Sequence, residues 1–252
     1  MSRPTALPEV VAWLDGYLRI ADAPDYPNAV NGLQVENGGQ VARIVAAVDA
    51  SLETITGLRR NDLLLTHHGL FWDGNQPVSG RRYRRLKALF DLDAALYSAH
   101  LPLDLHPDVG NNALLARALG VAISGGFGMH QGVAIGVQGA LAIHRDELVE
   151  RITSLLGARP RLVAGGPAAT ARIAIVTGSG GSLVREARDA GCDTLITGEG
   201  AHHTYFDAME WGVNLVYAGH YATETLGVKA LAEKTALQFG LPWEFHDHPT
   251  GL

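Results

Sequence analysis

The chain carries the stretch Leu63-Leu64-Leu65-Thr66-His67-His68-Gly69, an apolar run that ends in two adjacent histidines and a glycine. Its length and composition are those of a buried strand. In an α/β sheet such a strand would deliver both imidazoles to the carboxyl edge, where these folds bind ligands. The histidine pair therefore predicts nitrogen ligands for a metal ion, whereas packing or hydrogen bonding of the two rings is the plainer alternative. Three further stretches with polar ends favour the metal.

Composition limits the class of protein. The 252 residues are 47% hydrophobic and 18% charged, enough for one large domain or two of ordinary size. The formal net charge of -6 argues against a non-specific nucleic-acid binder. A single cysteine, Cys192, together with the lack of a secretion signal or a run of about 18 apolar residues, indicates a cytoplasmic protein outside the membrane. Eleven histidines are the first compositional indication of a metal.

Local patterns predict alternating helices and strands, and hence an α/β fold. Gly120 and Gly157 are expected to end two of the helices, and Ser51 to begin one. The Gly178–Ser182 segment is expected to be a tight turn, because a phosphate-binding loop would need the lysine that it lacks. Helices are expected at residues 7–20, 51–57 or 51–60, 80–90, 111–119 and 145–156, and strands at 41–49, 63–68, 94–99 and 133–143, with an extended or turn segment at 31–35.

The second half of the chain repeats the first. The matches are Ala42-Arg43-Ile44 with Ala171-Arg172-Ile173, Asp62-Leu63-Leu64-Leu65-Thr66 with Asp193-Thr194-Leu195-Ile196-Thr197, and Ala99-His100-x-x-x-Asp104 with Gly219-His220-x-x-x-Glu224. They predict two similar α/β units related by internal duplication, residues 1–127 and 128–252, with the glycine-rich segment Gly125–Gly128 as the seam. Two such units would bring both sets of strand ends into one cleft between them.

The predicted strand ends carry a set of possible ligands: His67, His68, His100, Asp104, Glu199, His220 and Glu224. Imidazole and carboxylate donors without thiolate suit zinc, manganese, iron or cobalt and argue against a structural zinc knuckle. Successive side chains of a strand point to opposite faces, so adjacent His67 and His68 suit two neighbouring ions, or a strained turn. A carboxylate such as Glu224 can bridge two ions, the usual arrangement for metal-assisted hydrolysis.

Other polar residues each allow two interpretations. His100 is expected to orient a ligand residue rather than to bind an ion itself. Glu199, His202 and His203 follow a strand end and are candidates for a catalytic general base or for substrate contacts. Their alternative role is to cap a helix with a packed imidazole. His246 and His248 are interpreted as a polar strand end rather than as a metal site.

The predicted helix at residues 80–90 is basic, with five cationic residues at Arg81, Arg82, Arg84, Arg85 and Lys87. It is interpreted as an amphipathic helix with a solvated cationic face. Tyr83, Leu86, Leu89 and Phe90 are expected on its apolar side. The alternative is a patch for an anionic substrate.

Taken together, five motifs resemble the conserved dinuclear-metal-centre family that is described as GTP-cyclohydrolase-type-2-like. They are NGLQV at 31–35, THHG at 66–69, SAHLPLD at 98–104 followed by VGNN at 109–112, TGEGAHH at 197–203 and AGHYATE at 218–224. The similarity runs in family order from about Trp13 to Leu231. The chain resembles the short form, without the insertion domain that some members carry between the halves.

The resemblance implies a homohexameric ring of two-domain α/β subunits, with a two-metal site that faces an internal cavity. Residue by residue, it implies that His67 and His68 bind one ion each, that Asp104 joins one of them and His220 the other, and that Glu224 bridges both. The cofactors would be two divalent ions per subunit.

The leading hypothesis is a metal-dependent hydrolase that acts on a small anionic or nucleotide-like substrate. The cyclohydrolase description comes from the resemblance alone. One alternative is a non-catalytic, metal-binding ring that serves as a scaffold or regulator. Another is a ring that threads nucleic acid. The net charge of -6 argues against threading, although the basic face between Arg81 and Lys87 leaves it open.

Overall fold

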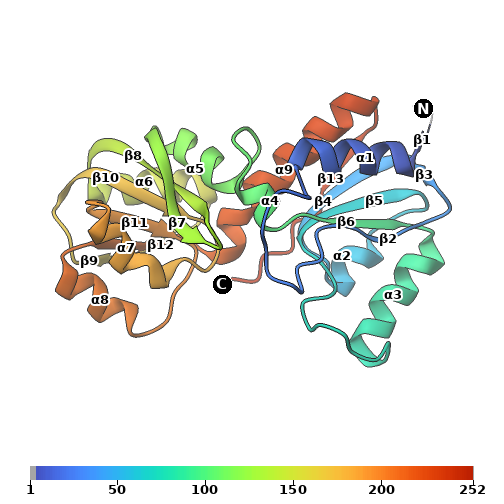
Figure 1. Ribbon diagram of the computed structural model, residues 1–252, viewed down its shortest axis with the longest axis horizontal. Helices are drawn as coiled ribbons and strands as arrows, with labels where there is room; N and C mark the ends of the chain where they lie inside the picture. Colours follow the sequence, from blue (N-terminus) through green and yellow to red (C-terminus); the bar gives the residue numbers. More distant parts are fainter. Residues whose placement is uncertain (1–3, 252) are drawn as a thin grey trace. The chain divides into compact units, whose positions relative to one another are not determined.

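The computed structural model describes residues 4–251, which form two compact α/β units (Figure 1). The first unit contains the chain up to Leu103 and the segment Gly227–His248, and the second contains Asp104–Leu226 and the residues from Pro249 onwards. This division differs from the expected boundary near residue 127. The units meet at Leu103 and Asp104, and the chain returns to the first unit within a single long helix, α9 (His220–Phe239).

The first unit is built on a five-stranded sheet of order β13-β4-β5-β6-β2. Strands β13, β4, β5 and β6 are parallel, β2 runs antiparallel to β6, and β1 and β3 form a separate antiparallel pair. The strands are β1 (Thr5–Ala6), β2 (Gly32–Val35), β3 (Gln40–Val41), β4 (Arg43–Asp49), β5 (Asp62–His68), β6 (Ala95–Ser98) and β13 (Trp243–Phe245). The helices, besides α9, are α1 (Leu7–Leu18), α2 (Leu52–Thr56), α3 (Gly80–Leu92) and α4 (Leu101–Asp104).

Helices cover both faces of this sheet, which explains why its strands are almost entirely apolar. On one face, Leu64 and Leu96 pack in a buried cluster with Ile55 of α2 and Leu89 of α3. On the other, the Tyr97 hydroxyl donates a hydrogen bond of 2.8 Å to Asp15 of α1. Burial and this bond raise the pKa of Tyr97. Figure 1 shows α1 and the end of α9 on one side, with α2 and α3 on the other.

Helix α3 forms where it was predicted, and Leu86 and Leu89 are buried as expected, but the rest of its buried face differs. Tyr83 and Phe90 were expected on the apolar side, yet they are 50% and 63% exposed, whereas Arg82 is buried. The Arg82 guanidinium donates hydrogen bonds to the Asp73 carboxylate and to the carbonyls of Gly74 and Gln76. The expectation for Tyr83 and Phe90 was wrong because this arginine, anchoring the loop before α3, takes a place in the buried stripe.

The second unit is built on a six-stranded sheet of order β7-β8-β10-β11-β12-β9. Its central strands β10, β11 and β12 are parallel, and the others run antiparallel to their neighbours. One face packs against α5 and α6 and the opposite face against α7 and α8. The elements are α5 (Asn111–Leu119), β7 (Ala122–His130), β8 (Val133–His144), α6 (Arg145–Leu156), β9 (Arg161–Ala164), β10 (Ala169–Val176), the short 3-10 helix η1 (Gly181–Leu183), α7 (Val184–Asp189), β11 (Thr194–Thr197), α8 (Thr204–Trp211) and β12 (Asn214–Tyr217).

The glycine-rich segment Gly125–Gly128 was expected to be the seam between units, and this was wrong. It lies inside strand β7, where Gly126 pairs with Val137 of β8. A Cβ atom on Gly126 would collide with the Cβ of Ala134. The glycines therefore allow the two strands of this hairpin to pack closely, rather than loosening the chain.

The parallel strand pairs of the two units share one register. Ile44 lies opposite Leu63 in the first unit, and Ile173 lies opposite Thr194 in the second, as in the sequence repeat. The Ala99 amide donates to the Thr66 carbonyl, and the Ala218 amide donates to the Thr197 carbonyl. Ala99 therefore corresponds to Ala218, so that the expected match of His100 with His220 is offset by one residue. The duplication itself stays a prediction.

Local signals set several helix ends as predicted. Ser51 accepts a hydrogen bond of 3.0 Å from the Thr54 amide at the start of α2. Gly120 and Gly157, with φ of +82° and +79°, end α5 and α6 in the left-handed conformation that glycine tolerates. Among residues 4–251, no helix combines the length and the apolar character needed to cross a membrane.

Candidate metal centre

Three histidines of the first unit lie together at the carboxyl edge of its sheet. His67 and His68 end β5, and His100 follows the neighbouring parallel strand β6. One ring nitrogen of each histidine lies within 4.8 Å of those of the other two. His67 is completely buried, and His68 and His100 are half-buried. The predicted strand end thus presents three imidazoles that could hold a metal ion.

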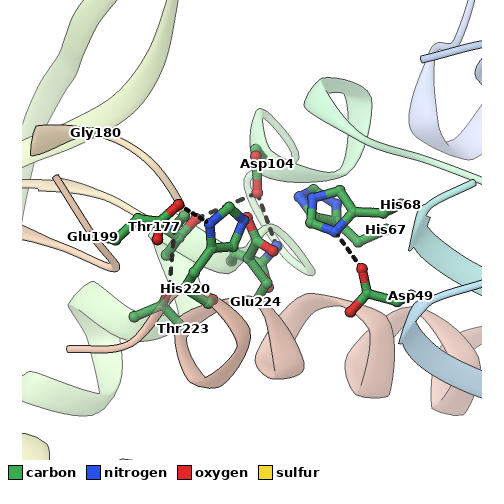
Figure 2. Close-up of polar contacts among 12 residues, drawn as sticks. Asp49, His67, His68, Asp104, Thr177, Gly180, Glu199, His220, Thr223 and Glu224 are labelled. Carbon is green, nitrogen blue, oxygen red and sulfur yellow. Dashed lines mark hydrogen bonds and ion pairs between the residues drawn. The ribbon is translucent and has the colours of Figure 1, made fainter. Parts of the chain in front are cut away.

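The Nδ1 atoms of His67 and His68 are each engaged by an oxygen. His67 Nδ1 lies 3.0 Å from the Ala99 carbonyl, and His68 Nδ1 lies 2.9 Å from the Asp49 carboxylate (Figure 2). Because these oxygens only accept, we assign the proton of each ring to Nδ1, which leaves the lone pair on Nε2. Histidines that bind metals are commonly oriented in this way.

His100 is held by a network that sequence reasoning missed. Its Nδ1 lies 2.9 Å from Asp25, a residue 75 positions earlier. Asp25 also accepts hydrogen bonds from the Leu101 amide and the Asn31 side chain, and Asn31 accepts one from the His100 amide. Burial by itself would raise the pKa of Asp25, but the hydrogen bond and charge of His100, with these other bonds, hold it below its usual value. The NGLQV motif thus fixes His100, and nothing in the sequence around Asp25 indicated its role.

Gln34, a second residue of the NGLQV motif, fixes the chain just after the end of β5. Its Oε1 accepts a hydrogen bond of 2.8 Å from the Leu70 amide, while its Nε2 donates to the carbonyls of Ala29 and Val30. A Cβ atom on Gly69 would collide with the Gln34 side chain. The glycine after the histidine pair therefore allows the Gln34 side chain to pack against the chain while it makes these hydrogen bonds.

The second unit contributes a histidine and a carboxylate on the first turns of α9. His220 and Glu224 are four residues apart, and His220 Nε2 lies 3.2 Å from Glu224 Oε1. On the other side of the ring, Nδ1 lies 2.9 Å from Glu199 Oε1 (Figure 2). The hydrogen bond and charge of Glu224, followed by those of Glu199, outweigh burial and raise the pKa of His220 to about 9. The carboxylates that stabilise a positive charge on this ring would also stabilise a divalent cation beside it.

The space beside His220 and Glu224 depends on a glycine. Gly178 has a φ of +67°, and a Cβ atom there would collide with Glu224 Oε1 and lie 3.3 Å from His220 Nε2. The Gly178–Ser182 segment forms a turn, as predicted, and the amides of Gly178 and Gly180 donate to the hydroxyls of Thr223 and Thr197. Because the protein itself satisfies these amides, they do not form a phosphate loop.

Asp104 is placed by the helix start that follows it. Its Oδ1 accepts a hydrogen bond of 2.8 Å from Asn111 and lies 3.5 Å from the Thr177 hydroxyl at the end of β10. Asn112 accepts a bond of 2.8 Å from the Thr177 amide and donates one of 2.9 Å to the Ile135 carbonyl. The two asparagines of the VGNN motif therefore tie Asp104 to the parallel sheet of the second unit, a role that the sequence alone did not indicate.

The three candidates for catalysis fall in different places. Glu199 contacts His220, whereas His202 and His203 are exposed residues just before α8. The ring of His202 packs edge-on against Phe206 with centroids 5.7 Å apart. At the other end of the chain, His246 and His248 pair with Glu244 and Glu53, consistent with a polar strand end.

Removal of the Glu199 carboxylate gives a test of its role. If Glu199 orients His220, Glu199→Ala should weaken binding of a divalent ion by about 10–100-fold, because the ring loses the partner of its Nδ1. Competition titration against a chromogenic chelator would measure this, with Glu210→Ala on the exposed surface of α8 as control. Unchanged metal affinity with loss of turnover would instead identify Glu199 as a general base.

The donor atoms fit a divalent metal ion. Imidazole nitrogens and carboxylate oxygens without a thiolate are the ligands of zinc, iron, manganese and cobalt. His67, His68 and His100 supply the nitrogens of the first unit, and His220 with Glu224 supplies both kinds of donor in the second.

Known proteins are similar to this chain over almost its whole length. A profile of the Duf34/NIF3 family (NGG1p interacting factor 3) matches residues 5–249. A Deinococcus radiodurans protein named GTP cyclohydrolase 1 type 2 homolog is 44% identical over 248 residues, which cover 97% of this chain and 94% of that protein. A protein of the same name from Halobacterium salinarum is 44% identical over 252 residues, covering 97% and 98%.

The fold is matched as well. The crystal structure of TTHA1606 from Thermus thermophilus is 40% identical and covers 98% of this chain and 100% of its own, with a TM-score of 0.91. The resemblance inferred from the motifs is confirmed, and the chain belongs to the Duf34/NIF3 family.

Proposed function

We propose that the protein binds two divalent metal ions and hydrolyses a small anionic, nucleotide-like substrate with them. One observation carries this proposal. Buried Glu224 lies against Nε2 of His220, while Glu199 engages Nδ1 of the same ring. A histidine held between two carboxylates in this way has the orientation and the local negative charge of a metal ligand.

The ligand set follows the motif resemblance. His67 and His68 would bind one ion each, Asp104 would join one of them and His220 the other, and Glu224 would bridge both. This proposal takes ligands from both units of the chain. The ions would be zinc, iron, manganese or cobalt, since the same donors accept all four.

Oxygen atoms around the proposed ligands engage the Nδ1 atoms of the histidines. The Ala99 carbonyl and Asp49 each keep a proton on the Nδ1 atom of His67 or His68, which leaves the Nε2 atoms of these two rings to bind. Glu199 engages Nδ1 of His220, and a divalent ion would replace the Nε2 proton that the raised pKa of this ring retains. Glu224, only 2% exposed, presents its charge in a place that water hardly reaches. Divalent ions, when bound by such donors, act as Lewis acids and lower the pKa of water, which is the chemistry of metal-assisted hydrolysis.

The substrate class is proposed from the relatives. Proteins at 44% identity carry the name GTP cyclohydrolase 1 type 2 homolog, which makes nucleotides the first compounds to screen. From the motif resemblance we further propose a homohexameric ring in the cytoplasm.

The interactions of the cationic residues in α3 favour a small substrate over nucleic acid. Arg82 donates a hydrogen bond to the Gly74 carbonyl in the loop before α3, and Arg85 donates one to the Ala50 carbonyl. Lys87 forms an ion pair with Asp91 at 2.8 Å. Three of the five cations that could contact phosphates therefore have structural partners, which weakens the case for a ring that threads nucleic acid.

The test combines metal content with turnover. Elemental analysis of the wild type should find about two ions per chain, and the loaded protein should hydrolyse at least one member of a panel of nucleotides and phosphoesters. His67→Ala should lose metal and lower the turnover by at least about 100-fold, with its oligomeric state in light scattering unchanged. His248→Ala, which removes an imidazole paired with Glu53, serves as control.

Two results would contradict the proposal. Full metal content without turnover of any compound would leave the scaffold as the better description. A wild type that takes up none of the four metals would remove the metal site itself.

A further inference from the structure

A cavity lies in the second unit at the ends of β11 and β12. It has a volume of about 290 Å³, and its lining includes Arg161, Gly200, His202, Tyr205, Phe206 and Tyr217. Gly200 belongs to the same loop as Glu199, the carboxylate that engages His220. Carboxyl ends of parallel strands are where α/β sheets bind their ligands. The cavity therefore shares its loop with Glu199, the neighbour of His220 in this unit.

The walls of the cavity are aromatic. Tyr205 and Phe206 at the start of α8 are 43% and 50% exposed, and their rings are perpendicular with centroids 5.4 Å apart. The His202 ring packs edge-on against Phe206. Large aromatic side chains on a surface leave apolar area in water, which is favourable to cover with a ligand. Their flat faces fit a planar ring.

Tyr217, another lining residue, is held in place by hydrogen bonding and packs against a glycine. The Tyr217 hydroxyl is hydrogen-bonded to the Thr204 hydroxyl, which fixes the position of its ring. A Cβ atom on Gly200 would lie 2.8 Å from the Tyr217 hydroxyl oxygen. The loop can approach Tyr217 this closely only because it has a glycine there, so the shape of the cavity is set by the fold.

Arg161 provides a positive charge in the lining of the cavity. Arg161 of β9 pairs with Tyr217 in the sheet, and its side chain is exposed. Between residues 4 and 251, no carboxylate forms an ion pair with Arg161, whereas nearby Arg159 pairs with Glu150. A guanidinium without a counter-ion beside an aromatic pocket is suited to the phosphate of a ligand whose ring fills the pocket.

We propose that this cavity binds the heteroaromatic ring of a nucleotide, with Arg161 contacting its phosphate. Its volume of about 290 Å³ is at the lower end of small-molecule sites, enough for one fused ring system. The identification of this nucleotide as the substrate rests on the proposed function, because it depends on the loop that the cavity shares with Glu199. Binding of the ring in the cavity does not depend on it.

Calorimetric titration with guanosine monophosphate and guanosine tests this assignment on the metal-loaded protein. Phe206→Ala should weaken the binding of both compounds by at least about 10-fold, because each loses a stacking partner. Arg161→Ala should weaken the monophosphate by about 10-fold or more and leave guanosine within about twofold of wild type, because only the monophosphate carries the charge.

Matched controls lie close by. Met209 is 46% exposed on the same helix as Phe206, and Arg159 is already paired with Glu150. Met209→Ala and Arg159→Ala should leave both affinities unchanged. Elemental analysis should find the wild-type metal content in all four variants.

The outcomes separate this inference from the proposed function. If the metal-replete wild type bound neither compound, or if Phe206→Ala bound both as tightly as wild type, the cavity assignment would be overturned while the metal centre stood. A different result would overturn the proposed function and support the cavity as a binding site. In that result the wild type holds no metal but binds the monophosphate, and both Phe206→Ala and Arg161→Ala weaken this binding.

Discussion

Replacement of Glu224 by alanine is expected to abolish high-affinity binding of divalent metal ions. Glu224 is 2% exposed and lies 3.2 Å from His220 Nε2, so its charge acts in a poorly solvated place. Losing a residue that merely orients a ligand costs about 10–100-fold in affinity, and losing a bridging carboxylate should cost at least the upper part of that range. Metal content by elemental analysis, and affinity by chelator competition, would measure the change.

Two further variants sharpen this experiment. Glu224→Gln keeps the shape of the side chain and removes its charge, so it should also lose metal while its circular-dichroism spectrum and unfolding midpoint stay near those of the wild type. Glu233 lies on the exposed surface of the same helix α9, and Glu233→Ala should retain full metal content. If Glu224→Ala kept the wild-type content and an affinity within about threefold, the bridging role would be wrong.

Replacement of Asp62 by alanine is expected to cost about 3–5 kcal/mol of the free energy of unfolding. Asp62 is 2% exposed and accepts hydrogen bonds from Nε and Nη2 of Arg43, which is itself buried, and from the Arg59 amide. The hydrogen bond to Asp62 is the main cause of the raised pKa of Arg43. The variant would leave the guanidinium in the interior with Glu244 as its remaining ionic partner among residues 4–251. Urea unfolding of metal-stripped protein, followed by circular dichroism, would measure the loss.

The repeat supplies the control for this prediction. Asp193 stands at the position that corresponds to Asp62, but it is half-buried and accepts from the backbone amides of Ala171 and Arg172, whose side chain is exposed. Asp193→Ala should therefore cost only about 1–2 kcal/mol, since no cation is left buried without its partner. Equal losses for the two variants would show that the ion pair with Arg43 is not the cause.

Predictions that depend on neighbouring residues agreed best with the structure. The helices that begin at Asn111 and Arg145 end where glycines follow, because a left-handed residue stops a helix by itself. The strand that ends in His67 and His68 was recognisable because a buried parallel strand is apolar along its whole length. The family was recognisable because its motifs are contiguous in sequence.

Predictions that depended on packing were less successful. Gly125–Gly128 has the composition of a linker and lies in a strand, because the need for close approach to Ala134 is visible only once the hairpin is formed. Arg82 looks like a surface cation and is buried, because its partners lie in a loop whose path the helical pattern does not contain.

Local patterns of residues were enough to predict the strands that precede His67, His68 and His100, five of the helices, and the donor types that suit a divalent metal. Helix α9, which carries His220 and Glu224, was not among the predicted helices. Folding in three dimensions was needed to show which side chains orient those donors. Asp25 holds His100 and Glu199 holds His220 across 75 and 21 positions of the chain, respectively. The physical reason is that a hydrogen bond depends on distance in space. Parallel strands bring their carboxyl ends to one edge, whatever length of chain lies between them.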